Sequence, residues 1–286
     1  MNKILPGLLL VTLLASCGGN KGTTDPFDSI TQIVDSVSRK GTDRDTLLPS
    51  HVQERLKPLE ADELFDDFIF NFASDKTLQE QRTVFPLPYH HAGVLKTITK
   101  ETWTHIDLFP GQNYYTILFD REEDIDLVGD TSLHAVQVEW FLLKKRILKK
   151  YSFQKKRGMW MLSSIDFSPI KAEKGDNDFL SFYTRFVTDS VYQRQHVCSP
   201  LKFITIDPDD DFAVLETTLD IDQWYAFRPM MPADSLSNFC YGQKNETSSN
   251  TKILKVNGIG NGYSNIFYFR KRHGSWELYK YEDTSI

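Results

Sequence analysis

Clusters of acidic, histidine and glycine residues are the first places to look for chemistry in this chain of 286 residues. The acidic run Asp207-Pro208-Asp209-Asp210-Asp211 offers the oxygen atoms that Ca²⁺ prefers. However, Phe212 stands where an EF-hand loop needs glycine, and Thr218 stands where it needs a bidentate glutamate. We therefore expect a solvated turn here rather than a calcium site.

Two other patterns are weak signals for ligands. His90 and His91 are adjacent, and no His-Glu-x-x-His or Cys/His framework accompanies them, so we expect no zinc site. The run Gly258-Ile259-Gly260-Asn261-Gly262 lacks the lysine of a P-loop and the spacing of a dinucleotide-binding fingerprint. Its two Asn-Gly pairs favour tight turns with positive φ. The sequence therefore predicts a loop here, and neither a metal nor a cofactor.

The apolar run that ends in Leu14-Ala15-Ser16-Cys17 contains a predicted lipid-attachment site. It resembles the lipobox of bacterial lipoproteins, in which signal peptidase II cuts before the cysteine. The run from Ile4 to Ala15 is shorter than the ~20 residues of a transmembrane helix. We expect residues 1–16 to be a signal peptide and acyl chains on Cys17 to anchor the mature protein in the cell envelope, at the periplasmic face of the outer membrane.

Charge and cysteine content exclude several classes of function. The formal net charge is -6, whereas nucleic-acid binding needs a basic face, so nucleic acid is not an expected partner. Neither Cys198 nor Cys240 lies in a nucleophile signature, and no Gly-x-Ser-x-Gly elbow is present. The two cysteines could form a disulfide in an oxidising envelope, or remain buried free thiols.

The chain contains an internal repeat. Eight residues of an early block return without gaps 114 positions later, and four residues of a later block return 116 positions later. The first set is Phe65, Phe68, Phe72, Asp75, Gln79, Gln81, Pro86 and Leu87, matched by Phe179, Phe182, Phe186, Asp189, Gln193, Gln195, Pro200 and Leu201. The second is Phe153, Gly158, Trp160 and Leu162, matched by Phe269, Gly274, Trp276 and Leu278. A repeat of this kind indicates two copies of one domain.

Each copy begins with helical patterns and ends with strand patterns. Phenylalanines at i, i+3 and i+7 lie on one helical face, and Ser74-Asp75 or Thr188-Asp189 then start a second short helix. That helix stops before Pro86 or Pro200. Alternating aromatic residues follow, in pairs of runs joined by turns that contain Gly158 or Gly274, which predicts hairpins. The fold class is therefore α+β.

This order of motifs resembles a family of lipoproteins of unknown function from gut Bacteroidales, whose members are described as similar to nuclear transport factor 2. The resemblance covers most of residues 60–286. It implies cone-shaped domains in which helices pack on a strongly bent antiparallel sheet. The superfamily includes isomerases and dehydratases, but no catalytic Tyr or Asp can be matched to this chain. We expect two such domains in tandem, residues 59–172 and 173–286, after a tether at 17–58.

The tether contains a short amphipathic pattern and three modification motifs. Asp25-Pro26 is typical of a helix start, and an apolar stripe follows until Gly41. A helix packed on the first domain and a helix on the membrane surface are both compatible with this pattern, and the lack of a Lys/Arg excess favours the former. Three Asp-Ser/Thr-apolar tripeptides resemble O-glycosylation acceptors of Bacteroides, at Ser29, Ser36 and Thr46.

A basic stretch without acidic residues stands out in this acidic protein. It comprises Lys144, Lys145, Arg146, Lys149, Lys150, Lys155, Lys156 and Arg157. Outward lysines often protect a strand edge or solvate a face. The alternative is a surface for an anionic partner, such as lipid headgroups or an acidic envelope protein.

The second copy contains the residues that we expect to line a pocket between helices and sheet. They are Trp224, Tyr225, Phe227, Phe239, Tyr241 and Gln243, which could equally fill the core. We predict a non-catalytic binding or scaffold module for a small ligand or an envelope protein. The alternative is a pocket enzyme of isomerase or dehydratase type, which needs a Tyr-Asp or His-Asp pair at hydrogen-bond distance in the pocket.

Overall fold

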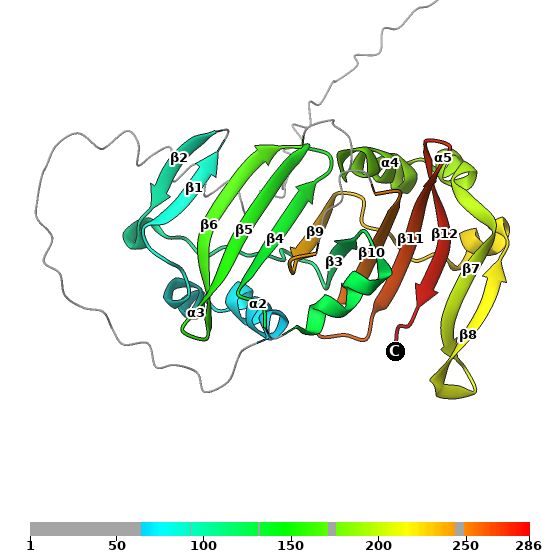
Figure 1. The fold of residues 1–286 in the computed structure, drawn as a ribbon, viewed down its shortest axis with the longest axis horizontal. Coiled ribbons are helices and arrows are strands. Elements are labelled where there is room, and N and C mark those ends of the chain that lie inside the picture. Colours follow the sequence, from blue (N-terminus) through cyan, green and yellow to red (C-terminus); the bar gives the residue numbers. More distant parts are fainter. Residues whose placement is uncertain (1–63, 92, 131, 171–175, 244–248) are drawn as a thin grey trace, which may run out of the picture.

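The computed structural model describes residues 64–91, 93–130, 132–170, 176–243 and 249–286. These residues form two six-stranded sheets, with short helices at their edges and faces (Figure 1). The α+β class predicted from the sequence is confirmed. Several predictions lie outside the described residues, namely the lipid site Cys17, the helix before Gly41 and the glycosylation residues Ser29, Ser36 and Thr46.

Among its described residues, the first half of the chain contains four helical segments and six strands. The helices are α2 (Phe65–Ser74), α3 (Lys76–Gln81) and the 3-10 helices η1 (Lys100–Thr102) and η2 (Glu122–Gly129). The strands are β1 (Leu87–His91), β2 (Val94–Ile98), β3 (Tyr114–Phe119), β4 (Ala135–Leu142), β5 (Ile147–Lys156) and β6 (Met159–Pro169).

The described part of the second half has the same order of strands and a similar order of helices. Its helices are α4 (Asp176–Thr188), α5 (Ser190–Gln195) and α6 (Ile221–Phe227). Its strands are β7 (Val197–Asp207), β8 (Asp210–Leu219), β9 (Ser235–Cys240), β10 (Thr251–Gly258), β11 (Ser264–Arg272) and β12 (Ser275–Asp283).

The repeated phenylalanines form the two cores, as their helical spacing predicts. In the first half, the ring centroid of Phe65 lies 5.1 Å from that of Trp160. In the second half, the rings of Phe179 and Trp276 are 5.3 Å apart. All four side chains are buried. The same contact between helix and hairpin therefore stabilises the core of each half, because large buried aromatic side chains dominate core energetics.

Helix caps and hairpin turns follow local chemistry. The second helix of each half is capped by an aspartate, because Asp75 accepts from Thr77 N (2.7 Å) and Asp189 accepts from Tyr192 N (2.9 Å). The hydroxyl of the preceding Ser74 does not cap this helix and instead donates to Phe70 O. The predicted hairpins are confirmed, since Gly158 and Gly274 have positive φ in the two-residue turns of β5–β6 and β11–β12.

The two halves exchange one strand. Sheet A has the order β2-β1-β6-β5-β4-β9, and sheet B, read from its far edge, has the order β8-β7-β12-β11-β10-β3. The sheets are mixed rather than antiparallel throughout as we expected, because β1 pairs in parallel with β6 and β7 pairs in parallel with β12. Equivalent strands occupy equivalent positions except the last, where β9 pairs with β4 and β3 pairs with β10. The sheets therefore cross the boundary that we expected between residues 172 and 173. Local strand patterns could not reveal this, because β3 and β9 compete for equivalent sheet edges.

The exchanged strands contact each other at the centre of the molecule, between the two sheets (Figure 1). Thr116 N donates to Ser237 Oγ (2.7 Å), and Ser237 Oγ donates to Thr116 O (3.0 Å). Leu118 N donates to Asn238 Oδ1 (2.9 Å). Side chains of β9 thus form hydrogen bonds with backbone groups of β3 that face away from β10. These bonds matter because a buried backbone N–H or C=O group needs a hydrogen-bond partner. The contact joins the two sheets edge to edge.

Candidate functional site

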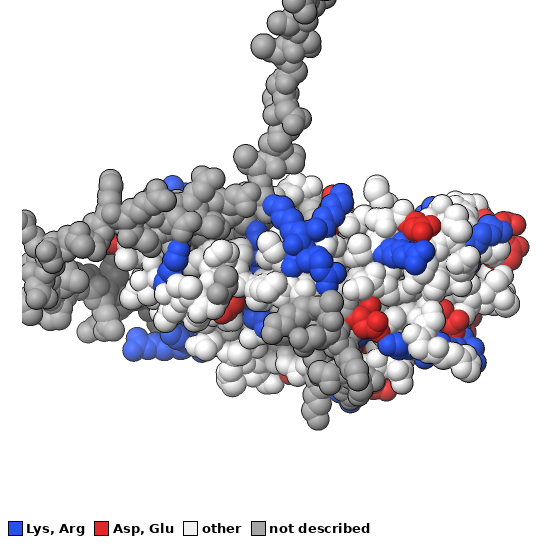
Figure 2. All heavy atoms as spheres, turned by 90° about the horizontal axis from the view of Figure 1, so that it is seen from above, with Lys and Arg blue, Asp and Glu red and all other residues white. Residues whose placement is uncertain are grey.

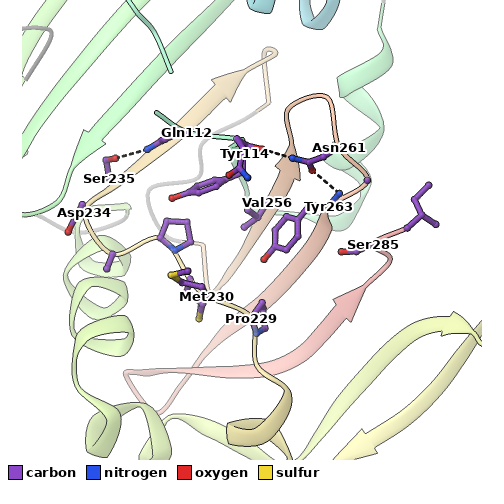
Figure 3. Close-up of a pocket in the computed structure, with 16 residues that line it drawn as sticks. Gln112, Tyr114, Pro229, Met230, Asp234, Ser235, Val256, Asn261, Tyr263 and Ser285 are labelled. Carbon is purple, nitrogen blue, oxygen red and sulfur yellow. Dashed lines mark hydrogen bonds between the residues drawn. The ribbon is translucent and has the colours of Figure 1, made fainter. Parts of the chain in front are cut away.

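A pocket of about 940 Å³ lies beside the start of β3 and β9 (Figure 3). Tyr114 and Tyr263 lie on one side with Val256 between them, and Pro229 and Met230 face them from the loop before β9. The remaining lining residues come from the same loop, the β10–β11 loop and the end of the chain. They are Gln112, Asn113, Met231, Pro232, Ala233, Asp234, Ser235, Asn261, Gly262, Ser285 and Ile286.

The loop before β9 is fixed at both ends. Arg228 donates to the buried Gln193 side chain at its start. The hydroxyl of Tyr183 donates to Pro232 O (2.9 Å), and Leu143 N donates to Asp234 O (3.0 Å). Residues 229–234 therefore form a positioned wall rather than a free connection.

The opposite wall is built by the glycine-containing loop of β10–β11. Asn261 Nδ2 donates to Asn113 O (3.0 Å), and Asn261 Oδ1 accepts from Tyr263 N (3.0 Å), which orients the loop against β3. A Cβ on Gly262 would lie 2.1 Å from Ile286 O, so only glycine allows the last residues to approach here. The run is a loop as predicted, although its positive φ occurs at Gly260 rather than in the Asn-Gly pairs.

The lining is mainly apolar and nearly free of charge. Of the described residues that line the pocket, Asp234 alone has a charged side chain, and its carboxylate is 2.6 Å from Lys144 Nζ. Burial, with a smaller contribution from Asp234, raises the pKa of Tyr114. Burial, with smaller contributions led by Asp283, raises the pKa of Tyr263. Both phenols are therefore protonated at neutral pH.

The equivalent place in the first half is filled. Phe153 and Phe269 are matching residues of the repeat, and they pair with Val136 of β4 and Lys252 of β10. Val136 and Lys252 therefore occupy matching positions. Four residues further along each strand, Trp140 of β4 corresponds to Val256 of β10. Trp140 is 3 % exposed, and its ring lies 5.9 Å from that of Phe109. An indole of β4 thus stands where β10 has an isopropyl group, which lines the pocket.

None of the predicted pocket residues lines this pocket. Trp224, Phe239, Tyr241 and Gln243 are buried, Tyr225 is half-buried with its hydroxyl on Ser190 O (2.6 Å), and Phe227 is exposed. Phe239 even belongs to the core of the first half, because β9 is exchanged. The missed signal was the Pro229-Met230-Met231-Pro232 run, together with the change from Trp140 to Val256 in the aligned repeat.

A Tyr-Asp pair does occur, but away from the pocket. The Tyr241 hydroxyl donates to the Asp66 carboxylate, and burial raises the pKa of Asp66 despite that hydrogen bond. Burial also raises the pKa of nearby Tyr115 to about 12. Tyr241 is 1 % exposed and none of the three residues lines the pocket. The cluster links the start of α2 to the exchanged strands.

The basic stretch divides into separate parts. Lys149 is buried with its ammonium group over the Phe167 ring, and Lys150 Nζ is 3.2 Å from Glu139 Oε1. The turn 144–146 and the turn residue Arg157 lie at opposite ends of the ten-residue strand β5. Figure 2 views the side of the β4–β5 turn and shows Lys and Arg side chains gathered near its middle. The eight residues therefore do not make one surface.

The other sequence signals have structural roles where they are described. Asp207 caps the β7–β8 turn by accepting from Asp209 N (2.9 Å), as a solvated turn predicts. Cys198 and Cys240 are both free thiols. Within the described ranges, no group of three or more His, Cys, Asp and Glu residues has the geometry to hold a metal ion. In that same part of the chain, no helix is long and apolar enough to cross a membrane.

Comparison with known proteins places this chain among proteins of similar sequence and fold. Residues 44–283 match the family described as "Domain of unknown function (DUF4348)". The crystal structure of an NTF2-like protein from Bacteroides fragilis is 57% identical, with a TM-score of 0.76, and the match covers 81% of this chain and 100% of that chain. Among proteins with curated descriptions, none matches. The chain therefore belongs to the DUF4348 family and has an NTF2-like fold.

Proposed function

We propose that this protein is a non-catalytic module that binds a small ligand in the pocket between Tyr114, Tyr263 and the loop 229–234. The observation that carries the proposal is the difference between the halves, because Trp140 fills the place that Val256 leaves open. The size of the pocket, about 940 Å³, suits a small organic molecule. Its walls are held by hydrogen bonds, so little ordering is needed on binding.

A tryptophan at position 256 tests this function. Ligand-observed NMR with a mixture of small aromatic fragments should detect binding to the wild type and none to Val256→Trp. Ala233→Trp fills the pocket from its half-buried wall and keeps the test valid if the first variant does not fold. Thr97→Trp adds an indole to exposed positions of β2 and should bind like the wild type. Fragment binding that survives both pocket variants contradicts the proposal.

The proposed setting is the bacterial cell envelope, with the mature chain anchored through lipid on Cys17 and the two halves descended from a duplicated domain. The lipobox-like residues before Cys17 and the repeat support this setting. Intact mass of the natively expressed protein provides the test. A mass that corresponds to acylated Cys17 at the new N-terminus agrees with the proposal, and a mass that includes Met1 contradicts it.

The second candidate function is an isomerase or dehydratase, and the Asp66-Tyr241 pair favours it. A carboxyl with a raised pKa beside a phenol can transfer a proton. For this function, the pair must contact a ligand, although Tyr241 is 1 % exposed. Chemical-shift changes at Tyr241 on ligand binding would favour catalysis, and changes confined to Tyr114 and Tyr263 would favour simple binding.

A further inference from the structure

We propose that the pocket selects an uncharged, mainly apolar ring compound that carries a hydrogen-bond acceptor such as a carbonyl oxygen. This inference rests on the proposed binding function and names the chemistry of its ligand. It follows from three features of the pocket, which are the charge of its lining, the state of its two tyrosine hydroxyls and the composition of its loop wall.

The lining disfavours a charged ligand. No lysine or arginine side chain lines the described pocket, so an anion would lose its water without gaining an ion pair. Among the described lining residues, Asp234 has the one carboxylate side chain, and Lys144 pairs with it at 2.6 Å. A cation would therefore have to compete with Lys144 for that carboxylate. A neutral ligand meets neither cost.

Two tyrosines supply hydrogen-bond donors for an acceptor. Tyr114 and Tyr263 lie on the same side of the pocket (Figure 3), and their hydroxyls have no hydrogen-bond partner among the described residues. Each phenol has a raised pKa through burial, so each keeps its proton and can donate it. A carbonyl or ether oxygen satisfies such donors, whereas a hydrocarbon leaves them unpaired.

The loop wall suits a ring rather than a flexible chain. Pro229 and Pro232 are rigid, and Met230 and Met231 between them have adaptable thioether side chains. Met230 is 91 % exposed, so it can move over a bound ring. Tyr114 and Tyr263 provide ring edges and faces opposite this wall. Aromatic rings and thioethers both pack favourably against a planar ligand.

Four probes with one ring system separate these features. They are naphthalene, methyl naphthyl ketone, naphthoate and naphthylmethylammonium, and each is titrated into the full chain at neutral pH by calorimetry. The ketone should bind most tightly. Naphthoate and the ammonium compound should bind at least about tenfold more weakly, because the pocket does not compensate their loss of water.

Single hydroxyl deletions test the donors. Tyr114→Phe and Tyr263→Phe should each weaken the ketone about three- to tenfold, the value of one hydrogen bond, and leave naphthalene unchanged. Tyr279→Phe is the matched control, because Tyr279 lies outside this pocket and should not affect any probe. If both variants bind the ketone as tightly as the wild type does, the tyrosines contribute only their rings and not their hydroxyls. This result would overturn the inference.

The outcomes distinguish this inference from the proposed function. If no probe binds the wild type, or if binding is indifferent to Val256→Trp and Ala233→Trp, the proposed function fails. If binding depends on those variants but naphthoate or the ammonium compound equals the ketone, the function stands and the ligand class proposed here is wrong. Preference for the ketone, lost with the tyrosine hydroxyls, supports both.

Discussion

The two halves of this protein build similar cores, and one difference between them, at a matched position of β4 and β10, bears on the pocket. Trp140 packs on Phe109 in the first half, whereas Val256 lies beside a pocket in the second. The helix-to-hairpin contacts are nearly the same in both, 5.1 Å for Phe65–Trp160 and 5.3 Å for Phe179–Trp276. The shared framework of helix and hairpin therefore tolerates either a large or a small side chain at this strand position.

The largest effect should come from emptying the filled half. Trp140→Val removes a buried indole from contact with Phe109, so we expect the free energy of unfolding to fall by about 2–4 kcal/mol. Urea unfolding measures this loss. A loss below about 1 kcal/mol would show that Trp140 does not fill the interior of the first half.

The exchanged strands should couple the halves energetically. Ser237→Ala leaves the buried Thr116 N without its partner, at a cost of about 1–3 kcal/mol. The two side-chain hydroxyls lie 3.4 Å apart, and a double-mutant cycle with Thr116→Val removes that contact, so we expect a coupling energy of about 0.5–1 kcal/mol.

Ser163 provides the control for this cycle, because its hydroxyl bonds to Ser152 O within sheet A. Ser163→Ala combined with Thr116→Val should be additive within about 0.5 kcal/mol in urea unfolding. Equal additivity for the Ser237 pair would contradict an energetic coupling of the Thr116 and Ser237 side chains.

The smallest effect concerns an aspartate that the second half lacks. Leu180 corresponds to Asp66, whose pKa burial raises above 3.8. A raised pKa means that the folded state favours protonated Asp66, so its contribution to stability is present below pH 3.8 and is lost as the pH rises through the folded pKa. Asp66→Asn should therefore melt above the wild type at neutral pH.

The pH dependence separates this effect from a change in packing. The difference in melting temperature between Asp66→Asn and the wild type should shrink as the pH is lowered towards 3.8. Asp67→Asn should show a smaller trend of the same sign, because the charge of the neighbouring Asp67 contributes to the raised pKa of Asp66. A difference that is constant with pH would contradict ionisation as its cause.

Local elements could be predicted from the sequence because their causes are local. The spacing of Phe65, Phe68 and Phe72 predicts α2, and the turns at Gly158 and Gly274 predict the hairpins. The strand exchange could not be predicted, since β3 and β9 have equivalent partners in either sheet. The pocket was missed for a related reason, because aromatic residues such as Trp224 fill the core, whereas the opening arises from a smaller residue at position 256.

A crystal structure of the protein with bound methyl naphthyl ketone tests the central comparison most directly. We expect density for the ring beside Val256, with its carbonyl oxygen at hydrogen-bond distance from Tyr114 or Tyr263. Density beside Trp140 and Phe109, or density only on the outer surface of the protein, would contradict the proposed difference between the two halves.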